Sequence, residues 1–333
     1  MKKKIVIAGA TGFIGRWIIE KFKNDYEIVA LSRKVDKDQE IDNVLWKKVD
    51  LYSISSTERA LEGADYAIYL VHSMQPSTRL NQGEFQDTDL LLADNFSRGA
   101  WKNNLKQIIY IGGILPKDKK NISKHLLSRF EVEKTLAEKK VPLTAIRAGI
   151  IIGPGGSSFK IIRNLIKNLP IMLCPKWTLS LNQPIDIFDI LKIIKKCLGN
   201  KDTYNKSIEV GGSKVLSYMD LIKLTANIMN KKRIIFSIPF FSVGLSKLWV
   251  SFFAKSSLNF VSPLVESLKH KMIPEENNMF FKLKKKDINK SISIALNGNT
   301  TKIPQFIPVY NEKNTVRSVQ RMRNPKSKKI DWI

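Results

Sequence analysis

The chain has 333 residues and a formal net charge of +26, with 43% apolar and 26% charged residues. These fractions exclude a disordered chain, a collagen-like chain and a coiled coil, and the length allows two domains or one large α/β domain with an appendage. The charge fits nucleic acid, an anionic membrane or an acidic substrate as partners, but a Lys-rich codon bias acting on a solvated surface competes with all three.

Residues 1–153 alternate short apolar runs with amphipathic stretches. Strands are predicted at 4–8, 27–32, 45–50, 66–71, 107–111 and 143–152, and helices at 12–22, 56–62, 87–103 and 126–139. Strands and helices in alternation predict an α/β fold with a Rossmann doubly wound parallel sheet, whose strands are covered on both faces.

The rhythm changes after Gly153. Helices are predicted at 158–168, 187–198 and 217–229, the last capped by Ser217, with a strand at 207–210 and a loop through Pro170 and Pro175. We expect residues 154–275 to form a smaller substrate-side lobe that is interleaved with the Rossmann core. Residues 276–333 are expected to form a basic C-terminal extension.

An apolar stretch rich in Phe and Trp occupies residues 234–255 and is predicted to be helical over 238–254. Residues 199–333 carry 24 basic and 9 acidic residues, against 32 and 21 in residues 1–198. The stretch is therefore a candidate for peripheral contact with an anionic membrane, and the alternative is a buried helix packed on the sheet. The sequence shows no uncharged apolar run long enough to span a membrane and no nucleic-acid-binding signature, so no nucleic-acid partner is expected.

The sharpest motif is Gly9-Ala10-Thr11-Gly12-Phe13-Ile14-Gly15, between the first predicted strand and the first predicted helix. Gly9 suits the tight turn out of the strand, Gly12 lets the backbone approach a pyrophosphate, and Gly15 lets the helix pack close to the sheet. The free N–H groups at the start of the helix favour phosphate. Residues 1–153 are therefore predicted to be an NAD(P)-binding Rossmann domain.

The ends of the next strands carry the other candidate cofactor contacts. Arg33 follows the second strand where an acid would hold the ribose of NAD, so NADP is the expected cofactor and NAD the alternative. Asp50 and Leu51 follow the third strand, where the acid suits the adenine amino group. Val71 and His72 end the fourth strand, at the carboxyl edge that would face the cofactor.

Together with the glycine motif, Asp50-Leu51 and the segment Arg147-Ala148-Gly149-Ile150-Ile151-Ile152-Gly153-Pro154-Gly155 resemble the extended and atypical short-chain dehydrogenase/reductases. Three further stretches look most like an NmrA-like, NAD(P)H-binding branch of uncharacterised bacterial proteins: 69–74, 125–133 and 169–189. The resemblance covers residues 1–230 well and the following ninety residues more loosely.

The family's chemistry uses a Tyr as acid/base, a Lys four residues later and a Ser that polarises the substrate carbonyl. In this chain His125 stands at the Tyr position, Arg129 at the Lys position, and Gly112 and Gly113 at the Ser position. The resemblance implies an NADP-dependent oxidoreductase for a small organic substrate, with His125 and Arg129 as the candidate catalytic residues. The replaced set supports the alternative, a non-catalytic NAD(P)H-binding sensor or an assembly or accessory protein.

The two cysteines, Cys174 and Cys197, have no metal-ligand spacing and no histidine nearby. We expect buried thiols in a reducing compartment and no metal site. The basic start and the apolar run at 5–10 imitate a secretory signal, but glycines and Arg16 interrupt it. A cytoplasmic location is expected, and the alternative is a cytoplasmic protein that associates with the membrane. The sequence predicts neither a particular substrate nor an oligomeric state.

Overall fold

The computed structural model describes residues 2–33, 35, 37–72, 85–116, 122–238, 265–275, 280–281 and 283–298. Its largest sheet has eight strands: β1 (Lys4–Ala8), β2 (Glu27–Ser32), β3 (Gln39–Ile41), β4 (Val44–Lys48), β5 (Tyr66–Tyr69), β6 (Gln107–Gly113), β7 (Leu143–Ala148) and β12 (Lys206–Val210). They lie in the order β12-β7-β6-β5-β1-β2-β4-β3, and every pair is parallel except β3 with β4. The predicted doubly wound parallel sheet is confirmed.

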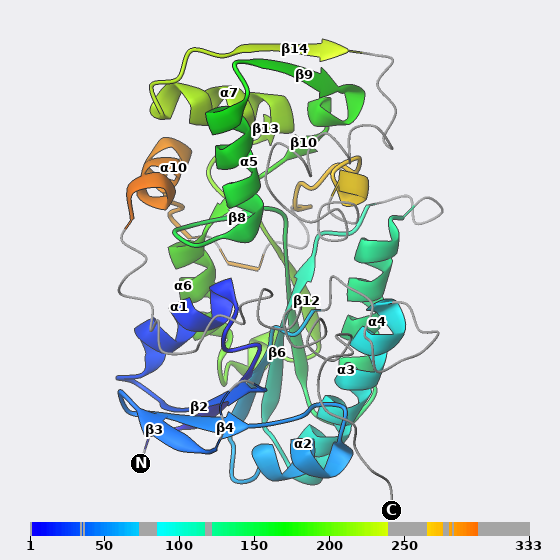
Figure 1. Ribbon diagram of the computed structural model, residues 1–333. Helices are drawn as coiled ribbons and strands as arrows, with labels where there is room; N and C mark the ends of the chain where they lie inside the picture. The colour runs from blue at the N-terminus through cyan, green and yellow to red at the C-terminus, as the bar shows by residue number, and fades with distance from the viewer. Residues whose placement is uncertain are drawn as a thin grey trace, which may run out of the picture.

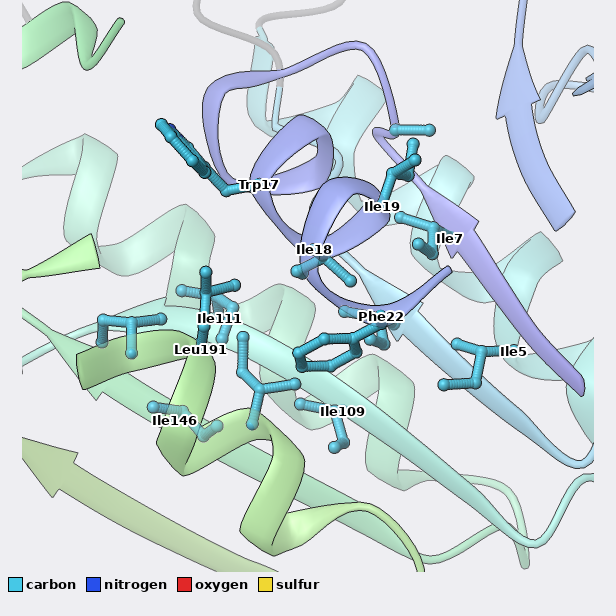
Figure 2. Close-up of a cluster of buried hydrophobic side chains, with 14 of the residues drawn as sticks. Ile5, Ile7, Trp17, Ile18, Ile19, Phe22, Ile109, Ile111, Ile146 and Leu191 are labelled. Carbon is cyan, nitrogen blue, oxygen red and sulfur yellow. The ribbon is translucent and has the colours of Figure 1, made fainter. Parts of the chain in front are cut away.

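Helices cover both faces of this sheet. Figure 1 shows α1 (Phe13–Phe22) and α6 (Ile187–Cys197) on one side, and α2 (Ile54–Ala60), α3 (Phe85–Lys102) and α4 (Lys124–Ala137) on the other. Each face has its own buried cluster. Figure 2 shows the first, where Ile18 and Phe22 of α1 and Leu191 of α6 meet the isoleucines of the strands. The central strands are apolar throughout because neither face meets water.

The rest of the described chain forms a smaller lobe beyond one end of the sheet (Figure 1). It contains α5 (Ser157–Asn168), α7 (Tyr218–Ile228) and α10 (Ile288–Asn297), the short helix η1 (Lys176–Leu179), and three strand pairs. The short helix η2 (Lys201–Thr203) lies instead at the start of β7, where the Thr144 hydroxyl donates to the Thr203 carbonyl at 2.8 Å. The pairs are β8 (Ile151–Ile152) with β11 (Ile185–Asp186), β9 (Ile171–Pro175) with β14 (Ile234–Ile238), and β10 (Leu181–Asn182) with β13 (Leu216–Ser217). A third buried cluster joins α5, α7 and α10.

The chain passes between the two parts more than once. β12 comes from the second half of the sequence but pairs in parallel with β7 at the edge of the large sheet. α6 likewise packs against α1 through Trp17 and Phe188, whose ring centroids are 5.0 Å apart. Segments of the sheet and of the smaller lobe thus alternate along the sequence. The expected boundaries after residues 153 and 275 stay predictions.

Two predicted elements differ in the structure. The strand expected over 143–152 is broken, because β7 ends at Ala148 and Ile151–Ile152 leaves the large sheet to pair with β11. The loop expected through Pro170 and Pro175 contains β9, which pairs in parallel with β14. The predicted cap of α7 is confirmed: the Ser217 Oγ accepts from the Asp220 N–H at 3.0 Å, and the Asp220 carboxylate accepts from the Ser217 N–H at 3.3 Å.

The membrane-contact candidate at 234–255 begins with a strand. Ile234 and Phe236 of β14 are exposed and Ile235 between them is half-buried, which is the period-two pattern of a strand. Residues 239–255, and with them nearly all of the helix expected over 238–254, lie outside the described residues. No described helix is both long and apolar enough to cross a membrane.

Candidate functional site

The glycine motif forms the turn between β1 and α1. Gly9 has a φ of +86°, a conformation that glycine adopts without strain, and the Gly12 N–H donates to the Gly9 carbonyl at 3.0 Å. A Cβ at Gly15 would lie 2.5 Å from the Gly9 carbonyl oxygen, so only glycine lets the helix approach the strand this closely. The start of α1, with its unpaired N–H groups, therefore lies directly beside the strand end.

This turn lies at the point where the sheet reverses its direction of winding. From β1 the chain runs outward through β2 and β4, then returns to β5 on the other side of β1. Ligands of open α/β sheets bind outside the carboxyl ends of the strands at such a switch point. A hollow of about 290 Å³, here called the first hollow, lies there. Most of the predicted cofactor contacts line it: Gly9, Thr11, Gly12, Arg33, Asp50, Leu51, Val71 and His72.

A second hollow, of about 250 Å³, continues from the first and shares Gly9, Gly12, Leu70 and His72 with it. Its lining contains Phe13, Ile14 and Gly15 of the motif and both candidate catalytic residues, His125 and Arg129. Of the residues proposed from sequence, Ala10 alone lines neither hollow, since its side chain is fully buried against the core.

Two histidines from different elements meet in the second hollow. The rings of His72 and His125 have centroids 4.8 Å apart. The His72 Nδ1 lies 2.8 Å from a carboxylate oxygen of Asp89, which also accepts from the Ser128 hydroxyl at 3.3 Å. Because the ionised carboxylate only accepts, the His72 Nδ1 carries the proton, and its buried Nε2 is an acceptor with no partner in the described structure.

His125 lies in a similar environment on α4. Its Nδ1 is 2.9 Å from the Ser267 hydroxyl, which lies 3.0 Å from that of Ser123. Burial, followed by the charge of Arg129 and the neighbouring His72, holds the pKa of His125 well below its ordinary 6.5. Burial and Arg129 also lower the pKa of His72, although Asp89 opposes them. Both imidazoles are therefore neutral at pH 7.

Arg129 lies one helical turn after His125, on the same face of α4. One of its terminal nitrogens donates to the Ile111 carbonyl at 3.4 Å, while its buried Nε has no hydrogen-bond partner among the described residues. Gly112 and Gly113 end β6 in register with Arg147 and Ala148 of β7. No side chain stands there to polarise a carbonyl, so the unpaired Arg129 N–H is a donor available for that task.

A third space, the apolar cavity of about 160 Å³, adjoins the second hollow. The two share His125, Arg129, Ala148, Gly149 and Ser158. The rest of the cavity wall is mostly apolar and comes from the smaller lobe. Trp177 lines this cavity, whereas Phe159 and Met172 are buried in the lobe's cluster.

The contacts that the sequence did not predict come from distant segments. Asp89 contacts a histidine 17 positions earlier, Ser267 contacts one 142 positions earlier, and Tyr218 joins the cavity wall from α7. No local pattern marks these residues, because only the fold brings them to the site. Among the described residues, no three His, Cys, Asp or Glu side chains are grouped so as to hold a metal ion.

The site fits a dinucleotide on several counts. The glycine turn borders both hollows at a helix start, and the two hollows follow one another along the strand ends. The buried His72 Nε2 and Arg129 Nε have no partners among the described residues. A bound dinucleotide would have its pyrophosphate against Gly9 and Gly12. Its nicotinamide end would then lie in the hollow that contains His125.

Comparison with known proteins supports this assignment. Residues 9–161 match the NAD(P)H-binding family. Auxiliary protein GraX of Staphylococcus aureus is 33% identical over 114 residues, which are 34% of this chain and 37% of GraX. The chain thus matches little more than a third of the length of this relative.

Solved structures resemble nearly the whole chain. A nucleoside-diphosphate-sugar epimerase from Staphylococcus aureus has a TM-score of 0.67 at 15% identity, over 88% of this chain and 99% of that one. The UDP-N-acetylglucosamine 4-epimerase of Methanobrevibacter ruminantium M1 has a TM-score of 0.65 at 14% identity, over 89% and 98%. The Bordetella bronchiseptica enzyme WbmG, in complex with NAD, has a TM-score of 0.61 at 14% identity, over 89% and 93%.

At these identities the solved structures establish the fold alone, a Rossmann-type α/β fold shared with these sugar-nucleotide epimerases. The family match supports NAD(P)H binding by residues 9–161. The expected nicotinamide cofactor is supported as a class. The choice between NADP and NAD, and the roles of the individual site residues, stay predictions.

Proposed function

We propose that this protein is an NADP-dependent oxidoreductase of the atypical short-chain dehydrogenase/reductase type, in its NmrA-like branch, acting on a small organic substrate. The observation that carries the proposal is the sequence of connected spaces. The second hollow, which would receive the nicotinamide, opens into a separate cavity through shared residues that include His125 and Arg129. A protein that only stored the cofactor would need no second ligand space at this end.

The preference for NADP rests on Arg33. It lines the first hollow next to Ser32, at the end of β2, where the ribose of the adenosine half would lie. A guanidinium there offers several donors to a 2′-phosphate.

The bound cofactor would supply hydride transfer at the nicotinamide. In hydroxyl oxidation, His125 is the residue suited to accept the substrate proton, because its depressed pKa keeps the imidazole neutral and ready to bind one. Arg129 is suited to hold a hydroxyl of the nicotinamide ribose through its unpartnered Nε–H. Ser267 and Ser123 orient the ring of His125 from its other nitrogen.

The test is substrate-dependent turnover of NADPH or NADP with His125→Ala. We expect kcat to fall about 100-fold or more, because a positioned acid/base contributes at least that factor, while the Kd for NADPH changes less than about 2-fold. His270→Ala is the matched control, since His270 lines none of the three spaces. Tight NADPH binding without turnover on a broad panel of alcohols and carbonyl compounds would count against the proposal.

The alternative is a non-catalytic NAD(P)H-binding sensor or accessory protein. The replacement of Tyr, Lys and Ser by His125, Arg129 and the glycine pair favours it, and so does the name of the relative GraX, an auxiliary protein. For this function the biological activity would survive His125→Ala. It would be lost in Gly12→Asp, whose carboxylate would occupy and repel the pyrophosphate position.

Peripheral contact with an anionic membrane stays a prediction. The described part of the candidate segment contributes two exposed apolar side chains, Ile234 and Phe236, and Lys231 and Lys232 next to them are exposed as well. A cytoplasmic location is likewise a prediction.

A further inference from the structure

The cavity beside the second hollow is small and mostly apolar, unlike a site for a nucleotide sugar. Its volume of about 160 Å³ is close to that of an engineered cavity of roughly 150 Å³ that binds benzene, and below the roughly 300–1,000 Å³ of pockets for drug-sized ligands. Six side chains of the smaller lobe form much of its wall: Ile161, Ile162, Leu165, Trp177, Ile222 and Met272. The space therefore suits one ring, not a nucleotide.

The polar side chains of its wall are His125, Arg129, Ser158, Tyr218 and Ser267, and two of them have a donor without a partner in the described structure. Tyr218 is 3% exposed, and its hydroxyl has no hydrogen-bond partner in the described structure. Burial raises the pKa of Tyr218 far above 10, so the phenol keeps its proton. Such an unpaired buried hydroxyl is costly unless a ligand satisfies it. The second free donor is the Arg129 Nε–H, at the boundary with the second hollow.

The charge of the wall argues in the same direction. Arg129 is the one lysine or arginine among its described residues, and no aspartate or glutamate lies there. A nucleotide sugar would need cations for its diphosphate and acceptors for its sugar hydroxyls. The wall offers neither in number, whereas an uncharged ligand with a carbonyl oxygen would need only what is present.

We propose that this cavity binds a small monocyclic carbonyl compound, such as an aryl ketone, a cyclic enone or a small quinone, with its ring among the aliphatic side chains and an oxygen accepting from the Tyr218 hydroxyl. This deepens the proposed function and rests on it only for the position of the ligand next to the nicotinamide. Tyr218 is then a specificity-determining residue of α7, and Trp177, whose ring centroid lies 6.3 Å from that of Tyr218, is a reporter within the cavity.

The experiment uses acetophenone as the probe and ethylbenzene as its matched analogue without oxygen, with binding to the full chain measured by calorimetry and by Trp fluorescence. We expect Tyr218→Phe to weaken acetophenone binding about 3- to 10-fold, the effect of one neutral hydrogen bond, and to leave ethylbenzene binding unchanged. The thermal stability of Tyr218→Phe should be equal to or above that of the wild type, because the substitution removes a hydroxyl without a partner.

Ile222→Trp, which fills the cavity, should abolish binding of both probes while NADPH still binds in the hollows; Ile162→Phe repeats the test if the first variant does not fold. Equal effects of Tyr218→Phe on the two probes, or tighter binding of UDP-glucose than of acetophenone, would overturn the inference. The proposed function fails separately: a protein that binds acetophenone but not NADPH contradicts the cofactor site and leaves the cavity's ligand class standing.

Discussion

The charge state of His125 depends both on the imidazole itself and on its buried surroundings. A histidine in water is half-charged near pH 6.5, but here burial and the charge of Arg129 hold it neutral. Arg129 thus lowers the pKa of the acid/base candidate, which is the effect that the family's Lys has on its Tyr. The pKa of His125 therefore depends on Arg129 as well as on burial.

Arg33 allows the cofactor preference to be tested at a single residue. Arg33→Ala should raise the Kd for NADPH about 5- to 10-fold, because charge-assisted hydrogen bonds to the 2′-phosphate are lost, and should leave the Kd for NADH within about 2-fold. Fluorescence titration of the two cofactors measures both values. Arg59→Ala is the control, an exposed arginine that lines none of the three spaces. Equal weakening of NADPH and NADH would contradict a role in selecting NADP.

Many residues of the candidate site could be predicted because short sequence patterns mark them. The glycine motif is a short run, and the strand-end residues Arg33, Asp50 and His72 follow from where apolar runs stop. Asp89 and Ser267 carry no such signal. Each contacts a histidine from another element, and only packing puts the two in reach.

At the scale of elements, the contact between β1 and α1 determines the shape of the cofactor site. A Cβ at Gly15 would lie 2.5 Å from the Gly9 carbonyl and 2.8 Å from the Ala10 backbone. Backbone atoms cannot move aside as a flexible side chain can, so any larger residue must push the helix away from the strand.

Gly15→Ala tests this contact. Alanine gains about 1 kcal/mol in helix propensity, but overpacking costs about 1–3 kcal/mol, and the upper part of that range applies because the clash is with backbone; we expect a net loss of about 1–2 kcal/mol in the free energy of unfolding. Gly149→Ala is the control, since its Cβ would meet Met272 at an ordinary 3.5 Å and should change stability by less than about 0.5 kcal/mol. Urea unfolding measures both; a Gly15→Ala variant as stable as the wild type would refute the close packing.

The ends of helices and strands were predicted well where they depend on the local sequence, and missed where they depend on a distant segment. The predicted helices of the first half agree with α1 to α4 within a few residues, because each has its own amphipathic pattern. The break between β7 and β8 was missed. Residues 143–152 form one apolar run, and it divides only because β11 is present to pair with Ile151 and Ile152.

At the scale of the whole molecule, the two buried histidines link folding to pH. Both have a pKa below the ordinary 6.5 when folded, so the unfolded chain binds more protons as the pH falls through that value. Stability is therefore full above about pH 6.5 and declines below it, by up to about 1.4 kcal/mol per pH unit for each histidine, until the folded state also takes up protons.

We expect urea unfolding to show a loss of about 1–3 kcal/mol between roughly pH 8 and pH 5.5. A His72→Gln, His125→Gln double variant should lose much less over the same range, and His270→Gln should behave like the wild type. The Asp65 carboxylate contributes at lower pH than this range, because its pKa is lowered to about 2. An unchanged slope in the double variant would mean that other groups bind these protons.

The sequence by itself determined the doubly wound α/β class and predicted the dinucleotide site at the glycine motif. Both depend on patterns within short segments: the spacing of apolar residues in strands and helices, and the spacing of glycines in a turn. The tertiary structure alone decided the rest. β12 returns from residues 206–210 to complete the sheet, His72 and His125 come together beside Asp89, and Tyr218, whose hydroxyl has no described partner, joins the wall of an apolar cavity. These features depend on contacts between segments far apart along the chain, so no pattern within a short segment predicts them.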